Sequence, residues 1–190
     1  RPSAPSTFDR PDGPPDLDRA VSERAGLLET TRRYFENRDF LEVETPHAVA
    51  SPGPDIYLEP IATRSLSSRE QRTVPDYLHT SPEFAMKRLL SEGLERIFQI
   101  CKVWRDGEMT DRHHPEFTMV EWYRAWEDLE AIIADTERLA TRATGGTATV
   151  VERTREGRDR REIDLDPPFR RLTMQQLVDE ACGFDLLEAL

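Results

Sequence analysis

Two stretches near the middle of the chain alternate between apolar and polar residues, within residues 97–124. A period of two is typical of β-strands, and a polar segment separates the stretches, so together they predict a long antiparallel hairpin. Because successive side chains of a strand point to opposite faces, every second residue shares a face. The residues of one such face on each strand are Gln99, Cys101, Val103 and Arg105, and Phe117, Met119, Glu121 and Tyr123.

The rest of the pattern predicts an α+β chain. Apolar residues at helical spacing predict one helix over residues 18–37 and another from residue 129 to just before Gly145. Shorter runs predict strands, and segments rich in Pro, Gly or polar residues predict connections. The expected strands cover residues 40–45, 147–152 and 161–165, and the expected loop and polar connection cover residues 47–60 and 64–72.

Capping residues predict two further helices. Ser81 is a favoured N-cap and Pro82 a favoured first helical residue, so we expect a helix over residues 81–93. A capping box followed by a terminating glycine predicts the last helix. These three residues are Thr173, Gln176 and Gly183.

Composition sets the broad class of the protein. The 190 residues, 37% hydrophobic and 33% charged, suffice for one globular domain with a core, with room for a partial second lobe. Residues 1–16 contain five prolines and are expected to form a flexible tail ahead of a folded region over residues 17–190. The sequence lacks a run of about 18 apolar residues, so a membrane-spanning helix is not expected.

The cysteines and the net charge indicate the cellular location and the kind of partner that the protein binds. The two cysteines do not suggest a disulfide framework, and with no apparent signal peptide we expect a cytoplasmic protein. Cys and His do not occur at the spacings of a structural zinc site. The net charge of −11 disfavours a nucleic-acid partner such as tRNA, because such binders carry a basic stripe. Solubility alone would also account for an acidic chain.

The hairpin could form a binding site if the two strand faces listed above lie on the same side of it. Arg105 could then hold a phosphate, Phe117 could stack on a base, and Glu121 with Tyr123 could hold a cation. That combination suits a nucleotide beside a positively charged small molecule. A two-faced hairpin with solvent-exposed charges would show the same pattern, and Glu83 in a first helical turn could simply complement the helix dipole.

Three segments resemble a known family. The segment FQICKVWRDGEMTDRHHPEFTMVEWYR resembles motif 2 of the lysine branch of class II aminoacyl-tRNA synthetases, through the arginine that opens the loop, the HxPEFT segment and the E-x-Y ending. FLEVETP resembles motif 1, and HTSPE followed by KRLL agrees with the same family. Motif 1 is expected at about residues 20–46 and motif 2 at about residues 97–124. Within this class the chain resembles the lysyl-tRNA synthetase-like enzymes that lysylate elongation factor P.

This resemblance implies a fold and a reaction. The fold is an antiparallel sheet flanked by helices, and motif 1 forms the interface of a homodimer. The reaction uses ATP and Mg²⁺ to convert lysine or β-lysine to an aminoacyl-adenylate, and then transfers it to a lysine side chain of elongation factor P. The family's magnesium ligands and motif 3 lie further along the chain, and residues 164–190 resemble neither of them, so we expect residues 17–190 to form part of a catalytic domain.

The resemblance also implies roles for individual residues. Arg105 contacts the α-phosphate and is the expected catalytic residue, while Phe117 stacks under adenine. Glu121 and Tyr123 hold the side-chain ammonium of the substrate. The complete expected sets are Arg105, Gly107, Glu108, His114 and Phe117 for ATP, and Ser81, Glu83, Glu121 and Tyr123 for the amino acid.

Two departures from the family pattern lie in the nucleotide-binding loop. Many members carry Asn where this chain has His114, whose ring can still donate a hydrogen bond. Gly107 places Glu108 one position later than usual, which leaves open whether Glu108 or the Gly107 backbone meets adenine.

Two alternative functions remain at this point. A lysyl-tRNA synthetase would share the chemistry, but only about 20 residues precede motif 1, too few for the anticodon-binding barrel of those enzymes. A non-catalytic synthetase-like binding module would fit the lack of a segment that resembles motif 3. The preference between α-lysine and β-lysine is not encoded in the matching segments.

Overall fold

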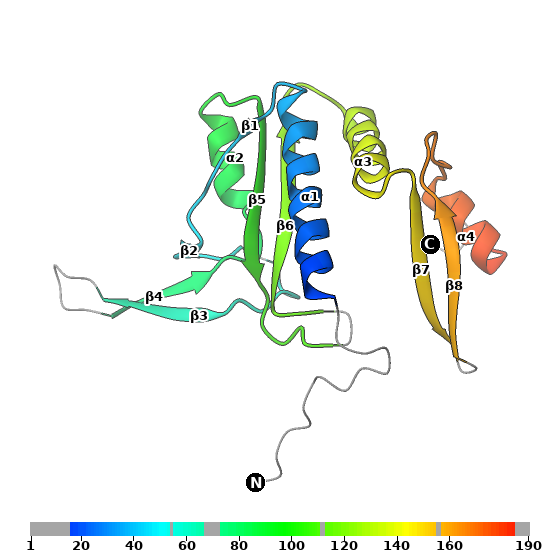
Figure 1. Cartoon of the computed structure of the whole chain (residues 1–190). Coiled ribbons are helices and arrows are strands. Elements are labelled where there is room, and N and C mark those ends of the chain that lie inside the picture. The colour runs from blue at the N-terminus through cyan, green and yellow to red at the C-terminus, as the bar shows by residue number, and fades with distance from the viewer. Residues whose placement is uncertain (1–15, 54, 67–72, 111–112, 155–156, 185–190) are drawn as a thin grey trace, which may run out of the picture. The chain divides into compact units, whose positions relative to one another are not determined.

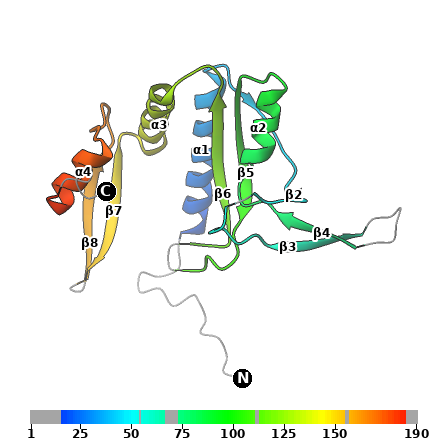
Figure 2. The ribbon, with the colours of Figure 1, turned by 180° about the vertical axis from the view of Figure 1, so that it is seen from behind.

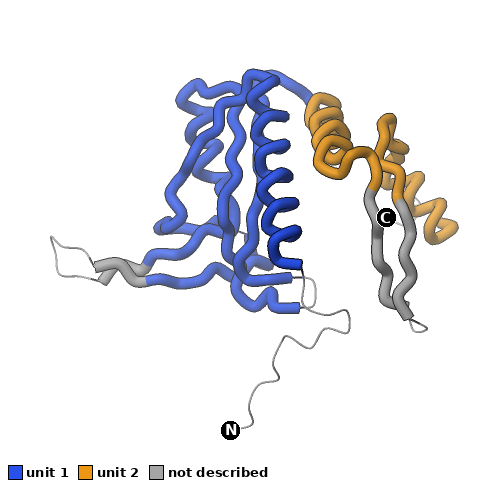
Figure 3. The backbone as a smooth tube through the Cα atoms, in the orientation of Figure 1, with its two compact units in different colours: residues 1–128 blue, residues 129–190 orange. Residues whose placement is uncertain are grey.

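The computed structural model describes residues 16–53, 55–66, 73–110, 113–154 and 157–184 (Figure 1). The chain divides into two compact units, residues 1–128 and residues 129–190 (Figure 3). The tail expected over residues 1–16 lies outside the described residues except for Asp16. Among the described residues, no helix is long and apolar enough to cross a membrane.

The central hairpin of the first unit consists of β5 (Arg96–Trp104) and β6 (Glu116–Arg124), which pair antiparallel. The register places Gln99 opposite Glu121 and Val103 opposite Phe117. Residues opposite each other in an antiparallel pair lie on the same face, so the expectation that the two polar faces coincide is confirmed.

A third strand, β1 (Leu41–Glu42), completes this sheet in the order β1-β5-β6 and runs parallel to β5. It is shorter than the strand expected over residues 40–45. Val43 still donates its N–H to the carbonyl oxygen of Phe98 at 2.9 Å. The pairing ends before Pro46, which has no N–H to donate to a ladder.

Helix α1 (Leu17–Glu36) covers one face of the hairpin. Asp16 caps it by accepting a hydrogen bond from the Arg19 backbone N–H at 3.1 Å, and the observed bounds confirm the predicted helix. The Phe35 ring stacks on Phe98, with centroids 4.8 Å apart, and both side chains are fully buried. Phe98 belongs to the face opposite Gln99 and Glu121, so α1 leaves the predicted site face uncovered.

Helix α2 (Glu83–Ser91) lies on the other side of the hairpin (Figures 1 and 2). The predicted helix exists, but Pro82 rather than Ser81 occupies its N-cap position, one residue later than expected. Ser81 nevertheless serves the helix end, because its Oγ accepts a hydrogen bond from the Glu83 backbone N–H at 3.1 Å. Pro82 has helical dihedral angles, so the Ser81 side chain reaches the backbone N–H of Glu83, the first residue of the helix.

A second sheet in the first unit has the order β2-β4-β3, with both pairs antiparallel. Its strands are β2 (Ala48–Val49), β3 (Ala62–Leu66) and β4 (Thr73–Leu78). The expected loop over residues 47–60 was therefore wrong at β2, and the expected connection over residues 64–72 was wrong at residues 64–66. The sequence of β3 is largely polar, so pairing with β4, rather than an apolar period, makes it a strand. Residues 67–72 lie outside the described residues.

The second unit contains α3 (Leu129–Thr144), β7 (Thr147–Thr154), β8 (Gly157–Asp164) and α4 (Met174–Cys182). Strands β7 and β8 pair antiparallel. β7 continues past the predicted end at residue 152, and β8 begins before the predicted start at residue 161 but ends at Asp164, just short of the predicted end. The predicted capping box is present, because Thr173 and Gln176 each accept a backbone N–H from the other. Gly183 ends α4 with φ of 70°, a conformation that favours glycine. The four predicted elements of this unit are confirmed.

Candidate functional site

Arg105 lies directly after β5, where the loop to β6 begins. Its backbone N–H donates to the carbonyl oxygen of Pro115 at 2.8 Å, which closes the base of the loop. Its side-chain Nε donates to the carbonyl oxygen of Thr80 at 3.4 Å, and its guanidinium carbon lies 5.2 Å from the centre of the Phe117 ring. The guanidinium is thus held between a backbone carbonyl and an aromatic face, with further N–H donors for a ligand.

A cavity of about 610 Å³ lies beside Arg105, within the range of small-molecule sites. Its lining residues are Arg105, Gly107, Glu108, Thr110, His113, His114 and Phe117. The structure therefore brings together all five residues that the resemblance assigns to ATP. Thr110 and His113 were not predicted, although they lie within the loop that the motif already marked. Both Gly107 and Glu108 line the cavity, so the choice between them as the contact to adenine stays open.

Local hydrogen bonds shape the loop around this cavity. Gly107, with φ of 73°, donates its N–H to the Asp106 carboxylate at 2.9 Å, and Asp106 donates its own N–H to the carbonyl oxygen of Glu59 at 2.7 Å. His114 Nδ1 lies 2.9 Å from the carbonyl oxygen and 3.2 Å from the N–H of Glu116. Because the backbone occupies this edge of the ring, a nucleotide contact from His114 would use Nε2.

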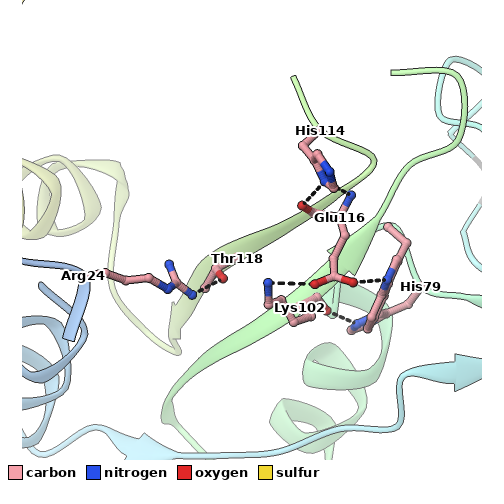
Figure 4. A network of polar contacts seen from close by, with 7 residues as sticks. Arg24, His79, Lys102, His114, Glu116 and Thr118 are labelled. Carbon is pink, nitrogen blue, oxygen red and sulfur yellow. Dashed lines mark hydrogen bonds and ion pairs between the residues drawn. The ribbon is translucent and has the colours of Figure 1, made fainter. Parts of the chain in front are cut away.

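A polar network supports the ends of the strands on the opposite face of the hairpin (Figure 4). The Glu116 carboxylate pairs with Lys102 Nζ at 2.8 Å and accepts from Trp104 Nε1 at 3.3 Å. The hydrogen bond and charge of Lys102 lower the pKa of Glu116. The sequence did not single out this network, and the only available signal was the alternation that places these residues on the hairpin's second face.

His79 joins β4 to this network. It is 2% exposed, and its ring packs against the rings of His47 and Trp104. Burial lowers the pKa of His79, so the ring is neutral at pH 7. Its Nε2 lies 2.8 Å from the carbonyl oxygen of Lys102, and because a carbonyl can only accept, Nε2 carries the donated proton.

Glu121 is the centre of a second polar group, on the site face. Its Oε2 accepts from Ser81 Oγ at 2.8 Å, and its Oε1 accepts from Tyr123 Oη at 2.5 Å. The structure thus places Ser81 against Glu121 and the N-terminus of α2. Burial raises the pKa of Tyr123 above its usual range, and the hydrogen bond to Glu121 and the carboxylates of Glu121 and Glu83 raise it further. Tyr123 is therefore a phenol that donates to Glu121.

Glu83 lies in the first turn of α2, close enough to Tyr123 to affect its pKa. Its carboxylate pairs with Lys87 Nζ at 2.5 Å, one helical turn away, and both side chains are partly exposed. The tyrosine therefore has carboxylates of two different elements near it, an arrangement that favours a ligand with more than one positive group. Lys87 was not predicted to take part, although its i, i+4 spacing from Glu83 was visible in the sequence.

A metal site is not built from the residues that the structure describes. No three His, Cys, Asp or Glu side chains among them lie close enough together to hold an ion. These residues do not provide a ligand set for the Mg²⁺ that the resemblance implies.

The family model of the class II tRNA synthetases (D, K and N) matches residues 14–187, nearly the whole chain. The chain belongs to this family. The expected fold class, a synthetase-like α+β structure with helices on both sides of the sheet, agrees with the match.

Individual relatives carry two kinds of name. An elongation factor P–(R)-β-lysine ligase of Pseudoalteromonas translucida is 36% identical over 89% of this chain and 46% of its own length. A protein of the same name from Klebsiella pneumoniae is 42% identical over 62% of this chain and 36% of its own. A lysine–tRNA ligase of a Synechococcus species is 36% identical over 90% of this chain and 32% of its own. The chain spans about a third to a half of the length of these relatives.

Proposed function

We propose that the protein activates lysine or β-lysine with ATP and transfers it to a lysine side chain of elongation factor P. One observation carries the proposal. A single hairpin face carries a guanidinium above an aromatic ring, which suits a nucleotide, and a carboxylate held by two hydroxyl groups, which suits an ammonium. ATP and a cationic amino acid are the two substrates that this pairing would bring together.

The first step joins these substrates. A carboxylate oxygen of the amino acid attacks the α-phosphorus of ATP, an O–P bond forms, and the bond to the departing pyrophosphate breaks. This step depends on positioning and on stabilising negative charge. Arg105 contacts the α-phosphate and stabilises the charge of the transition state, and Phe117 stacks under adenine. Gly107, Glu108 and His114 line the same cavity and frame the nucleotide.

The protein recognises the amino-acid substrate by its two positively charged ammonium groups. Glu121 and Tyr123 hold the side-chain ammonium, and Glu83 accepts the α- or β-amino group. The bound amino group then replaces Lys87 as the partner of Glu83. Ser81 contributes by fixing the Glu121 carboxylate from the α2 side, at 2.8 Å. Two carboxylates match the two ammonium groups of the substrate.

The second step transfers the activated acyl group. The uncharged amine of a protein lysine attacks the acyl carbon of the adenylate, and a C–N bond forms. The acyl C–O bond to AMP breaks, AMP leaves, and the nitrogen releases one proton to give the amide. Relatives named as elongation factor P–(R)-β-lysine ligases support this acceptor, and the net charge of −11 favours a protein over tRNA. The lysine–tRNA ligase relative makes tRNA the second candidate acceptor.

The oligomeric state and the cellular location are part of the proposal. We propose a homodimer whose interface includes the motif 1 segment at about residues 20–46. A cytoplasmic location fits the two cysteines, neither of which forms a disulfide.

Lysine-dependent exchange of labelled pyrophosphate into ATP tests the first step in the full-length protein. We expect exchange in the wild type and a loss of at least roughly 100-fold in Arg105→Ala, on the scale of removing one transition-state donor. Arg170→Ala is the matched control, because Arg170 forms an exposed ion pair with Glu180 and does not line the cavity at Arg105, so exchange should persist. Exchange that survives Arg105→Ala would contradict the assignment. Offering elongation factor P and tRNA as acceptors then separates the two transfer reactions.

A further inference from the structure

Gln99 places a polar side chain in the interior of the hairpin. The residue is 1% exposed, and neither Nε2 nor Oε1 has a hydrogen-bond partner in the part of the chain that the structure describes. An unpaired buried polar group is destabilising, and nearly all such groups in folded proteins are paired. The exception at Gln99 therefore needs a physical reason.

The nearby cysteine does not provide that reason. Cys101 lies two residues along the same face, and the Gln99 amide acts to lower the pKa of its thiol. Burial outweighs this effect and raises the pKa of Cys101 to about 11, so the group remains a thiol. A thiol is a weak hydrogen-bonding group. It leaves most of the amide's hydrogen-bonding capacity unused.

The position of Gln99 suggests what uses that capacity. The register of β5 and β6 places it directly opposite Glu121. Side chains opposite each other in an antiparallel pair have Cβ atoms about 4.5–5.5 Å apart and share a face. Gln99 on β5 and Glu121 on β6 therefore lie side by side on the same face of the hairpin. Ser81 and Tyr123 donate hydrogen bonds to the Glu121 carboxylate.

An ammonium bound at Glu121 needs more than one acceptor, because it carries three N–H donors. Both oxygens of Glu121 already accept a hydroxyl group, which leaves each with one further lone pair. We propose that Gln99 Oε1 accepts a hydrogen bond from the side-chain ammonium held by Glu121, and so helps to select an amino acid that ends in a positive charge. This inference rests on the proposed function and adds a specificity-determining residue to it.

The neutrality of glutamine fits this role. A carboxylate at position 99 would face Glu121 directly, and like charges opposite each other in a sheet are destabilising. One of the two would then take up a proton and become a poorer acceptor. Glutamine offers a carbonyl oxygen of the same reach and leaves one negative charge for one ammonium.

Gln99→Met tests the inference, because methionine keeps the length of the side chain and removes its amide. Calorimetry on the full-length protein would measure binding of lysine, of norleucine, which lacks the ammonium, and of ATP. We expect lysine to bind roughly tenfold more weakly or worse, the scale of one hydrogen bond to a charged group. Norleucine and ATP should bind as before. The melting temperature should stay equal or rise, because the substitution removes an unpaired buried group.

Cys101→Ala is the matched control, a substitution on the same buried face that should leave lysine binding unchanged. Unchanged lysine affinity in Gln99→Met would overturn the inference. So would an equal loss for lysine and ATP with a lower melting temperature, since it would mark the amide as structural, and so would an equal loss of lysine affinity in Cys101→Ala.

If the proposed function is wrong but the inference about Gln99 is right, the binding and exchange experiments give a different combination of results. A wild type that binds lysine without exchanging pyrophosphate would refute adenylate formation, while the comparison with Gln99→Met would still decide the role of the amide. A wild type that binds no lysine would overturn both.

Discussion

Replacing Glu121 with alanine removes the carboxylate on which the amino-acid half of the proposed site depends. The substitution should change two quantities that can be measured independently. One is the free energy of unfolding, because Ser81 and Tyr123 both donate to this carboxylate. The other is the affinity for lysine, because the substrate ammonium would meet no counter-charge at this position.

The expected magnitudes follow from the contacts. Two lost hydrogen bonds at about 0.5–1.5 kcal/mol each lower the free energy of unfolding by about 1–3 kcal/mol. Leaving a buried charge unpaired costs about 3–5 kcal/mol, which corresponds to a lysine affinity roughly 100- to 4,000-fold weaker. Glu121→Gln keeps an acceptor for one hydroxyl group and removes the charge, so it should lower lysine affinity with a smaller loss of stability.

The assay is calorimetric binding of lysine and, separately, of ATP, together with urea unfolding of each variant. ATP binding should be unchanged, because the cavity at Arg105 and Phe117 does not include Glu121. Glu127→Gln is the matched control, since Glu127 forms partly exposed ion pairs with Arg96 and Arg124 near the end of β6. Equal lysine affinity in Glu121→Ala and the wild type would refute the assignment of this carboxylate to the substrate.

The pKa of Tyr123 is raised in the folded protein, so the stability it contributes is present below about pH 10 and is lost as the pH rises beyond the value for an unfolded tyrosine. Urea unfolding between pH 9 and 11 should therefore show a steeper loss of stability in the wild type than in Tyr123→Phe, and parallel curves would contradict the raised pKa. Cys101 is buried with a pKa raised to about 11 and Cys182 is exposed, so at pH 8 iodoacetamide should modify Cys182 at least roughly tenfold faster. Peptide mass spectrometry would measure both rates, and preferential labelling of Cys101 would disprove this order.

Much of the local structure was predictable from the sequence. The hairpin, α1, α3 and the capping box of α4 were all predicted, because period, caps and terminating glycines act within a few residues of the chain. The prediction failed at β2 and β3, where pairing with β4 determines the strands. It was also one residue early at the start of α2, where the Ser81 side chain bonds to Glu83 and to Glu121 at once.

The candidate site was predictable in part, for a related reason. Strand alternation alone put Phe117, Glu121 and Tyr123 on one face, and the motif marked the loop after Arg105. The supporting contacts were not predictable, because they join distant segments: Ser81 donates to a residue 40 positions away, and Arg105 donates to the backbone of Thr80. The network of Lys102, Trp104 and Glu116 likewise appears only once two strands are in register.

The sequence by itself determined which residues share a strand face, where most helices begin and end, and which family motifs are present. Tertiary structure decided how that face is used. It set the register that places Gln99 opposite Glu121, brought α2 onto the site face, and left a buried amide without a partner among the described residues. The physical reason is the range of the interactions: alternation and capping depend on neighbours along the chain, whereas burial and hydrogen bonding across elements depend on the packed fold.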